Sequence, residues 1–537
     1  MEEQTDTSQE RCTKIVFSKE ARSGLLKGIE AAASAVGCTL GPRGKTVLIQ
    51  KPGAMPLVTK DGVTVSRSIK LKDPIERMGA DLVKEAATHT NEVAGDGTTT
   101  ATVLTHALVA EGHRLVEMGY NPVAVCKGIE EARDVITATL AKASKQVSTS
   151  AEIAQVATIS ANGDKNIGDL IAQAMEAVGK EGIITVEDAK RLTTSLEVAE
   201  GMQVDRGYVS PYFVTSQEKM QAVYENCYVL VCDRKLSSLQ ELVPTLETII
   251  REQRSLLIVA EDIEGEALQG LILNRIKSNL PVVAIRSPGY GQNQVDVLND
   301  ICVLSGATLI SSSTGTKLEK TSASALGCLK KVVVDSKFTT LVGTGVTKEK
   351  LEAHVANLRS QVNDVTIGQE TLDKLRMRIA RLAAGVAVVK VGGSTEIEMI
   401  ERKYRVEDAL NATRAAVEEG IIPGGGMMLF DISLLGKSAS DDNNVVAGFD
   451  AVMKACLAPV KKIVSNAGIT PDVVIEKLKD FRNNGHQLLG YNCTTGKYVD
   501  LIEEGVVDPA KVTRIAIQNA CSVAMTFLSL DAVVFDE

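Results

Sequence analysis

The spacing of apolar positions divides the chain into helical flanks around a mixed middle. Residues 18–40, 75–91 and 406–419 carry Ala, Leu, Ile and Val at helical spacing, with charged residues between them. In the middle, short apolar runs alternate with helical patterns, which is typical of an α/β domain. The runs expected there as strands are 228–231, 256–259, 282–285, 308–310 and 332–334, and the expected helices are 241–251 and 266–278.

A chain of 537 residues is too long for one hydrophobic core. Because the flanks are mainly helical and the middle is α/β, the middle is predicted to be inserted into a helical domain. Two connecting segments would form a small hinge domain. The fold class is thus a multidomain protein, mainly-α and α/β, whose expected segments are 1–142 and 419–537 (helical domain), 143–199 and 387–418 (hinge domain) and 200–386 (inserted α/β domain).

Composition narrows the function classes. Aromatic residues make up 3% of the chain, Trp is absent, and the net charge is −9 without a basic stripe, so we expect no nucleic-acid partner. No stretch approaches the ~20 apolar residues of a membrane span, and no membrane partner is expected. The ten cysteines are scattered without a C-x-x-C motif, and the N-terminus is acidic and unlike a targeting leader. These features favour a cytoplasmic protein with reduced thiols.

The segment 93–102 carries the most informative motif. An acidic residue between two glycines, followed by three threonines and an apolar run, predicts a loop that enters a helix. The free N–H groups and the dipole of a helix start suit a phosphate, and the hydroxyls of Thr98–Thr100 add donors. Asp96 would repel phosphate, but a carboxylate beside phosphate oxygens commonly holds Mg²⁺. The motif predicts a Mg-nucleotide site, although an ordinary capped helix start could use the same residues.

Two further turns precede this motif. Thr39-Leu40-Gly41-Pro42 ends a predicted helix, and the following 44–46 resembles the end of a P-loop but lacks its first glycine. Lys60-Asp61-Gly62 lies between two β-branched runs, so a hairpin with an Asp-Gly turn is expected. The three turns lie within about 60 residues and are expected to meet on one ligand.

Taken together, the segments 39–42, 60–62 and 95–100 strongly resemble the group I chaperonins of the GroEL type. The resemblance continues along nearly the whole chain, and 405–420 is as specific as the first motif. It implies a GroEL-like fold with a helical equatorial, a small α/β intermediate and an inserted α/β apical domain, with the boundaries given above. It also implies an ATP-dependent chaperone that captures non-native polypeptides and encloses them in a ring cavity.

The resemblance assigns roles within an ATPase site. Asp96 would hold Mg²⁺, while Asp61 and Asp408 would order the water that attacks ATP. A K⁺ ion would lie near Thr39, Lys60 and Thr99. Cys493 stands where many relatives carry Ala. The residues expected to contact the nucleotide are Thr39, Leu40, Gly41, Pro42, Lys60, Asp96, Gly97, Thr98, Thr99, Thr100, Ser160, Gly425, Tyr491, Asn492, Cys493 and Asp508.

Polypeptide capture would fall to the inserted domain, where apolar stripes could also simply pack into a core. By resemblance, a surface groove there would bind unfolded or misfolded polypeptides and possibly a GroES-type lid. Seven or so subunits would form each ring. The groove residues expected from the resemblance are Tyr208, Tyr212, Phe213, Val243, Leu246, Leu268, Ile272 and Leu273.

Two alternative functions are considered, and the sequence departs from the family's pattern at one expected contact. A holdase or scaffold with this fold but no ATP cycle is the main alternative; a metabolic kinase is disfavoured because a Walker A motif is absent. The compartment could also be an organelle matrix or, for a virus-encoded protein, the host cytoplasm. At the positions that match the family's ring–ring contact, this chain has Lys461 and Thr470, so the usual acidic partner is missing, and Met118 adds bulk. We therefore expect single rings in at least one nucleotide state, although Asp472, two residues further on, could take over the role of the missing carboxylate.

Overall fold

The protein packs into two compact units in this computed structural model. We call Met1–Ala172 with Thr395–Glu537 the helical unit, and Gln173–Ser394 the inserted unit. No helix in the described part of the chain is long and apolar enough to cross a membrane. The described residues are 13–536 without 51–55, 148, 162, 180–181, 190–192, 218, 312–317, 319–322, 344–345, 347, 363–368, 384 and 487.

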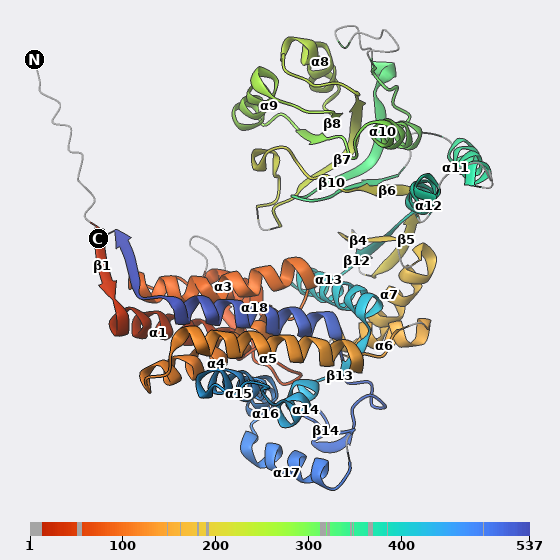
Figure 1. The fold of residues 1–537 in the computed structure, drawn as a ribbon. Coiled ribbons are helices and arrows are strands. Elements are labelled where there is room, and N and C mark those ends of the chain that lie inside the picture. Colours follow the sequence, from red (N-terminus) through yellow and green to blue (C-terminus); the bar gives the residue numbers. More distant parts are fainter. Residues whose placement is uncertain are drawn as a thin grey trace, which may run out of the picture. The chain divides into compact units, whose positions relative to one another are not determined.

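Long helices lying side by side form the body of the helical unit (Figure 1). The main core between these helices includes Leu104, Leu108, Ile129 and Phe527, all fully buried, and a smaller second core includes Phe430 and Leu478. The helices of this unit are α1 (Ser18–Gly37), α2 (Gly62–Ser68), α3 (Pro74–Ala94), α4 (Thr98–Glu117), α5 (Pro122–Ala143), α6 (Ser150–Ser160), α13 (Glu396–Glu419), α14 (Met427–Leu435), α15 (Asn443–Ala455), α16 (Ala458–Asn466), α17 (Pro471–Asn483) and α18 (Ala510–Ser529), with α7 (Lys165–Val178) crossing into the inserted unit.

Close helix packing in this unit depends on small residues. A Cβ on Gly28 would lie 1.8 Å from the Glu76 carbonyl oxygen, so only glycine lets α1 approach α3 this closely. This packing fixes the N-terminal part of α3, the helix that ends at the first sequence motif.

Four two-stranded antiparallel sheets complete the helical unit. Pairing of Thr13 with Asp536 brings the two ends of the described chain together, and pairing of Ile422 with Asp508 joins two segments of the predicted site. The strand pairs are β1 (Thr13–Phe17) with β17 (Ala532–Asp536), β2 (Val47–Ile49) with β3 (Leu57–Thr59), β13 (Ile421–Pro423) with β16 (Val507–Pro509), and β14 (Leu489–Asn492) with β15 (Lys497–Asp500).

The inserted unit is built on a six-stranded mixed sheet in the order β6-β11-β10-β7-β8-β9. All five residues of β8 are buried, which suits a central parallel strand. Its strands are β6 (Gly201–Val204), β7 (Ala222–Val231), β8 (Leu256–Ala260), β9 (Val282–Arg286), β10 (Gly327–Val334) and β11 (Thr339–Val342). A second sheet has the order β4-β12-β5, from β4 (Ile183–Asp188), β5 (Ser195–Ala199) and β12 (Val386–Val391).

Helices cover the larger sheet of the inserted unit (Figure 1). They are α8 (Val243–Glu252), α9 (Gly265–Ser278), α10 (Gln292–Ser305), α11 (Lys348–Val362) and α12 (Gln369–Ala383), with the short 3₁₀ turns η1 (Pro211–Phe213), η2 (Gln240–Leu242) and η5 (Ala323–Ala325). An inserted α/β unit within a mainly helical unit confirms the predicted fold class. The finer division into a hinge domain stays a prediction.

Two local predictions were wrong. The run 308–310 forms only an isolated bridge, between Ile310 and Cys232. The segment 59–64 is not a hairpin, because Asp61 caps the N-terminus of α2; the hairpin there is instead β2 with β3. The Asp-Gly pair permits both structures, and tertiary packing selects the helix start.

Candidate functional site

The loop between α3 and α4 has the conformation that its glycines allow. Gly95 ends α3 at φ 72° and Gly97 caps α4 at φ 81°, both in the left-handed region. A Cβ at Gly95 would lie 2.4 Å from Asn411 Cβ, and one at Gly97 would lie 2.4 Å from Val512 Cγ1. The loop is therefore pressed between α13 and α18, and it points the unpaired N–H groups of α4 into one place.

Asp96 lies at the centre of this loop. One of its carboxylate oxygens accepts a hydrogen bond from the Gly97 N–H. Desolvation by burial raises the pKa of Asp96, the Gly97 bond lowers it, and the nearby Asp61 raises it further. A half-buried carboxylate beside another negative charge is a suitable position for a cation.

Asp61 is held in a fixed orientation by its role as a helix cap. Its carboxylate accepts hydrogen bonds from the backbone N–H groups of Val63, at 3.1 Å, and Thr64, at 2.8 Å. A Cβ on the following Gly62 would lie 2.3 Å from Thr99 Oγ1. The start of α2 therefore packs directly on the start of α4, which brings Asp61 beside the threonine motif.

The segment after α1 also reaches this place. Thr39 Oγ1 donates to the Val36 carbonyl at 2.8 Å and lies 3.4 Å from Thr99 Oγ1. Asn466 on α16 fixes the segment by donating to the carbonyls of Gly37 and Leu40, each at 2.9 Å. The segment around Gly41 and Pro42 is exposed. The turns at Thr39 and at Asp61 therefore both contact the first turn of α4, and the third predicted turn leads into that helix.

Asp408 reaches the same group of carboxylates from α13. The pKa of Asp408 is raised well above its usual value, first by desolvation and then by the negative charges of Asp96, Asp61 and Glu407. Its side chain is nevertheless exposed at the surface. Water reaches this carboxyl, so repulsion from the neighbouring carboxylates acts on its pKa together with desolvation. The carboxylates lie within electrostatic reach of one another, although about 310 to 350 residues separate Asp408 from the other two in sequence.

Asp508 on β16 contributes a fourth carboxylate. Desolvation by burial and the charge of Asp96 raise its pKa to about 6, against the lowering effect of hydrogen bonds from the backbone N–H groups of Gly426 and Gly425. Gly425 and Gly426 have φ of 67° and 78°, and a Cβ on Gly425 would meet open space. The glycine turn therefore holds Asp508 and leaves room for a ligand beside it.

The strand pair β14 and β15 supplies the residues expected at the nucleotide base. The rings of Tyr491 and Tyr498 lie 4.9 Å apart. Asn492 Oδ1 accepts hydrogen bonds from two backbone N–H groups in its own turn, at 2.9 and 3.3 Å. Cys493 is buried, with 5% of its surface exposed. Arg43 donates to the Thr494 carbonyl at 3.4 Å, which links this turn to the segment after α1.

Other predicted positions are less closely tied to the carboxylates. Ser160 ends α6, a helix that packs on α13. Lys60 is exposed next to Asp61. Among the described residues, no group of three or more His, Cys, Asp or Glu side chains could hold a metal by itself.

The predicted groove residues of the inserted unit divide into three groups. Tyr212, Val243 and Leu273 are 64%, 39% and 51% exposed, respectively. Tyr208, Leu268 and Ile272 are partly buried and pack against the core. Phe213 and Leu246 are buried, at 0% and 6% exposed, so the prediction that they form the surface was wrong; their side chains support it from below.

Sequence reasoning also missed residues of both sites. Ile250 on α8 and Ile276 on α9 are each 60% exposed beside the predicted apolar stripes. Asn411 donates to the Gly95 carbonyl at 3.3 Å, and Asn466 holds the Thr39 segment, but single amides inside helices give no signal in the sequence. The apolar spacing itself could have suggested Ile250 and Ile276.

Comparisons with known proteins identify the family of this chain. The model of the TCP-1/cpn60 chaperonin family matches residues 32–537. A similar solved structure is the chaperonin gp146 from the bacteriophage EL 2 (Pseudomonas aeruginosa), crystallised in the presence of ATP-BeFx. One crystal form has a TM-score of 0.69 and 23% identity, and a second has 0.63 and 22%. Both alignments cover 97% of this chain and 99% of gp146. The chain therefore belongs to the TCP-1/cpn60 chaperonin family, as its resemblance to the GroEL type indicated.

Proposed function

We propose that this protein is an ATP-driven folding chaperone that hydrolyses Mg-ATP at the start of α4. Membership of the chaperonin family supports a chaperone function in general. The observation that carries the ATPase is the gathering of Asp61, Asp96 and Asp408 at a glycine-rich helix N-terminus, where their charges raise the pKa values of Asp96 and Asp408. Such a group of carboxylates is costly unless a cation joins it.

Each residue then has a chemical task. The N–H groups and hydroxyls of Thr98–Thr100 bind phosphate oxygens, and the exposed turn at Gly41 approaches them from the other side. Asp96 holds Mg²⁺, which when bound screens the phosphate charge. Asp61 is oriented by its capping bonds, and together with Asp408 it positions and deprotonates the attacking water. Asp508 accepts a hydrogen bond from the ribose.

The remaining nucleotide contacts and the second cation follow the same geometry. Tyr491 and Asn492 lie at the end of β14, and Cys493 lies in the following turn, which Arg43 joins to the Thr39 segment. The three residues are therefore suited to enclose the base. The hydroxyls of Thr39 and Thr99 lie 3.4 Å apart and could both coordinate K⁺. Lys60 would contribute its backbone carbonyl.

Polypeptide capture is assigned to the exposed apolar surface of the inserted unit. Tyr212 on η1 packs beside α9, and Gly270 on α9 would bring a Cβ within 2.5 Å of Leu239, which leads into η2 and α8. Tyr212, Val243 and Leu273 are exposed along these elements, and such a surface suits an unfolded segment or the loop of a lid protein.

Enclosure requires assembly, and the helical unit offers apolar strands for it. Phe17 and Val534 on the β1 and β17 pair are 61% and 53% exposed, while Leu48 and Val58 on the β2 and β3 pair are 68% and 59% exposed. Two-stranded sheets with exposed edges are marginal alone and favour pairing with another chain. We propose homo-oligomeric rings of about seven subunits, in the cytoplasm, with the organelle matrix or a virus's host cytoplasm as alternatives.

Steady-state ATP hydrolysis with Mg²⁺, with and without a denatured client protein, tests the proposal. A chaperone hydrolyses ATP slowly without any small acceptor, and the client changes the rate. If the protein binds client but hydrolyses no ATP, it is a holdase with this fold. If turnover requires a small acceptor molecule, it is a kinase.

A further inference from the structure

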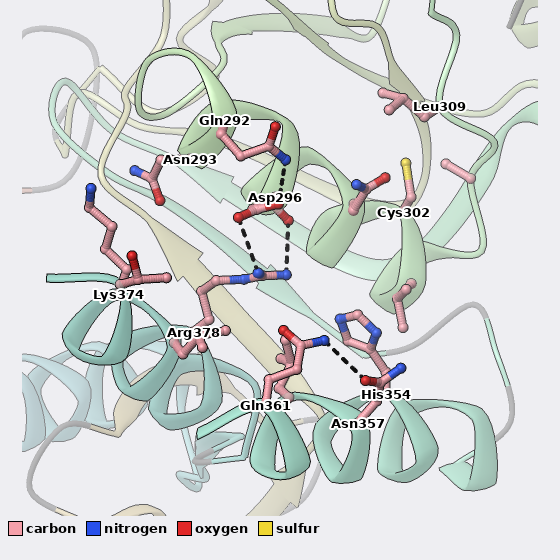
Figure 2. Close-up of a pocket in the computed structure, with 16 residues that line it drawn as sticks. Gln292, Asn293, Asp296, Cys302, Leu309, His354, Asn357, Gln361, Lys374 and Arg378 are labelled. Atoms are coloured by element: carbon pink, nitrogen blue, oxygen red, sulfur yellow. Dashed lines mark hydrogen bonds and ion pairs between the residues drawn. The ribbon is translucent and has the colours of Figure 1, made fainter. Parts of the chain in front are cut away.

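A cavity of about 700 Å³ lies between α10, α11 and α12 of the inserted unit (Figure 2). Its volume is within the range of ligand sites in proteins. None of its lining residues belongs to α8, α9 or η1, which carry the apolar surface described above. The carboxylates of the nucleotide site belong to the helical unit. The cavity is therefore separate from both sites already assigned.

Ion pairs fix the walls of this cavity. Asp300 is almost fully buried and accepts hydrogen bonds from Arg378 Nε, at 2.7 Å, and Nη2, at 2.8 Å. His354 Nε2 lies 2.8 Å from the same carboxylate. Arg378 also lies 3.4 Å from Asp296. These contacts tie the three helices together and occupy Arg378, so an anionic ligand would find this guanidinium already engaged and the Asp296 carboxylate opposing it.

Side-chain amides dominate the rest of the polar lining. Two of the contacts drawn in Figure 2 are made by these amides, from Gln292 Nε2 to Asp296 at 3.1 Å and from Gln361 Nε2 to Asn357 at 3.1 Å. Each carboxamide offers N–H donors and an acceptor oxygen, so it can pair with both the C=O and the N–H of a peptide group. The five carboxamides of the lining are Gln292, Asn293, Asn299, Asn357 and Gln361.

The other end of the cavity is apolar. It includes Cys302, Val303, Leu309 and Leu358. Figure 2 shows Cys302 and Leu309 at the opposite end from Lys374. Burial raises the pKa of Cys302 to about 12, so its thiol stays neutral and forms part of an apolar wall. Among the described lining residues there is no Trp, Tyr or Phe on which a sugar or a base could stack.

We propose that this cavity binds an extended polypeptide segment. The carboxamides would hydrogen-bond its main chain, whose N–H and C=O groups are unpaired when the segment is unfolded, and an apolar side chain would enter the Leu309 end. This inference rests on the proposed function, because it assumes that the protein binds non-native polypeptides. The cavity would be a second polypeptide site, which binds the main chain, whereas the apolar surface binds side chains.

The test uses the full-length protein without nucleotide and a defined probe. The probe is a Gly-Ser-Leu-Ser-Gly peptide amide that carries fluorescein and a photoreactive leucine. The comparison peptide is the same except for N-methyl groups on its backbone amides. Anisotropy measures affinity, and mass spectrometry maps the cross-links. We expect cross-links on α10 and α11, and binding weakened roughly tenfold or more both by N-methylation and by Asn299→Ala/Asn357→Ala. Both substituted residues are exposed, so the fold should persist.

Two control variants make the result specific. Arg359→Ala/Ser360→Ala changes exposed residues of α11 outside the cavity and should leave binding unchanged. Tyr212→Ala/Leu273→Ala removes the apolar surface; it should lower binding at that surface and leave the cross-links on α10 and α11 unchanged. Cross-links confined to η1, α8 or α9, equal binding of the N-methylated probe, or no saturable binding would overturn the inference. Binding here without any ATP hydrolysis would reject the proposed ATPase and leave this site standing.

Discussion

Replacing Asp508 with Asn should stabilise the nucleotide-free protein while weakening nucleotide binding. The pKa of Asp508 is raised from 3.8 to about 6, so the folded state disfavours its charge. The free energy of unfolding is highest below the pKa of the unfolded state, where Asp508 is protonated in both states, and it falls as pH rises through about 6. The ionised side chain therefore destabilises the fold at pH 8. Asn keeps an oxygen that can accept from Gly425 and Gly426.

The size of the effect follows from the shift. About two pKa units correspond to roughly 3 kcal/mol at about 1.4 kcal/mol per unit, and this is an upper limit because surface accessibility shows Asp508 only half-buried. We therefore expect about 1 to 3 kcal/mol at pH 8 and roughly half of that at pH 5. At about 2 °C per kcal/mol for a large domain, the transition of the helical unit should rise by about 2 to 6 °C at pH 8.

Differential scanning calorimetry of both proteins at pH 5 and pH 8, with and without Mg-ADP, measures this. Asp431→Asn is the matched control, because the pKa of Asp431 is also raised by burial but its carboxylate pairs with Arg482 at 2.7 Å. That variant should be less stable at both pH values. If Asp508→Asn lowers the transition at pH 8, or raises it equally at both pH values, burial and the charge of Asp96 do not disfavour the ionised form of Asp508 in the folded protein.

Further expectations concern the ATPase, the apolar surface and the rings. Asp408→Ala should keep nucleotide affinity and lose nearly all turnover, whereas Asp96→Ala should weaken Mg-ATP binding itself, as titration and turnover on the same preparations will show. Tyr212→Glu or Leu273→Glu should abolish suppression of client aggregation and spare ATP hydrolysis, since both side chains are exposed. Lys461 forms an ion pair with Asp472 of its own chain, so its charge is already paired and contributes less to a contact between rings. We therefore expect the particle mass in solution to show single rings in at least one nucleotide state, and double rings in every state would contradict this.

Local pattern predicted the elements well where apolar spacing and capping signals agree. The helix start at Thr98 follows from its glycines and threonines, and the fully buried β8 follows from an unbroken apolar run. The same reasoning failed at Asp61, because an Asp-Gly pair fits a hairpin turn and a helix cap equally. On α8, the spacing identifies an apolar face but not which of its residues is covered, so Leu246 was expected at the surface and is in the core.

The candidate site could not be assembled from local pattern alone. Its carboxylates are Asp61, Asp96, Asp408 and Asp508, which come from four segments spread over more than 400 residues. Periodicity gives no information about contacts at such separations. The resemblance to a family supplied the grouping, and the mutual effects of these carboxylates on their pKa values now give it a physical basis.

The connection between nucleotide and polypeptide can be argued from the course of the chain. The chain returns from the inserted unit at Thr395, which caps α13 by accepting a hydrogen bond from the Glu398 N–H at 3.2 Å. Asp408 lies 13 residues further along the same uninterrupted helix, about 20 Å at 1.5 Å per residue. Asn411, one turn later, is pressed against Gly95. In the proposed mechanism, a nucleotide contact at Asp408 would therefore act on the same continuous helix that receives the chain from the inserted unit.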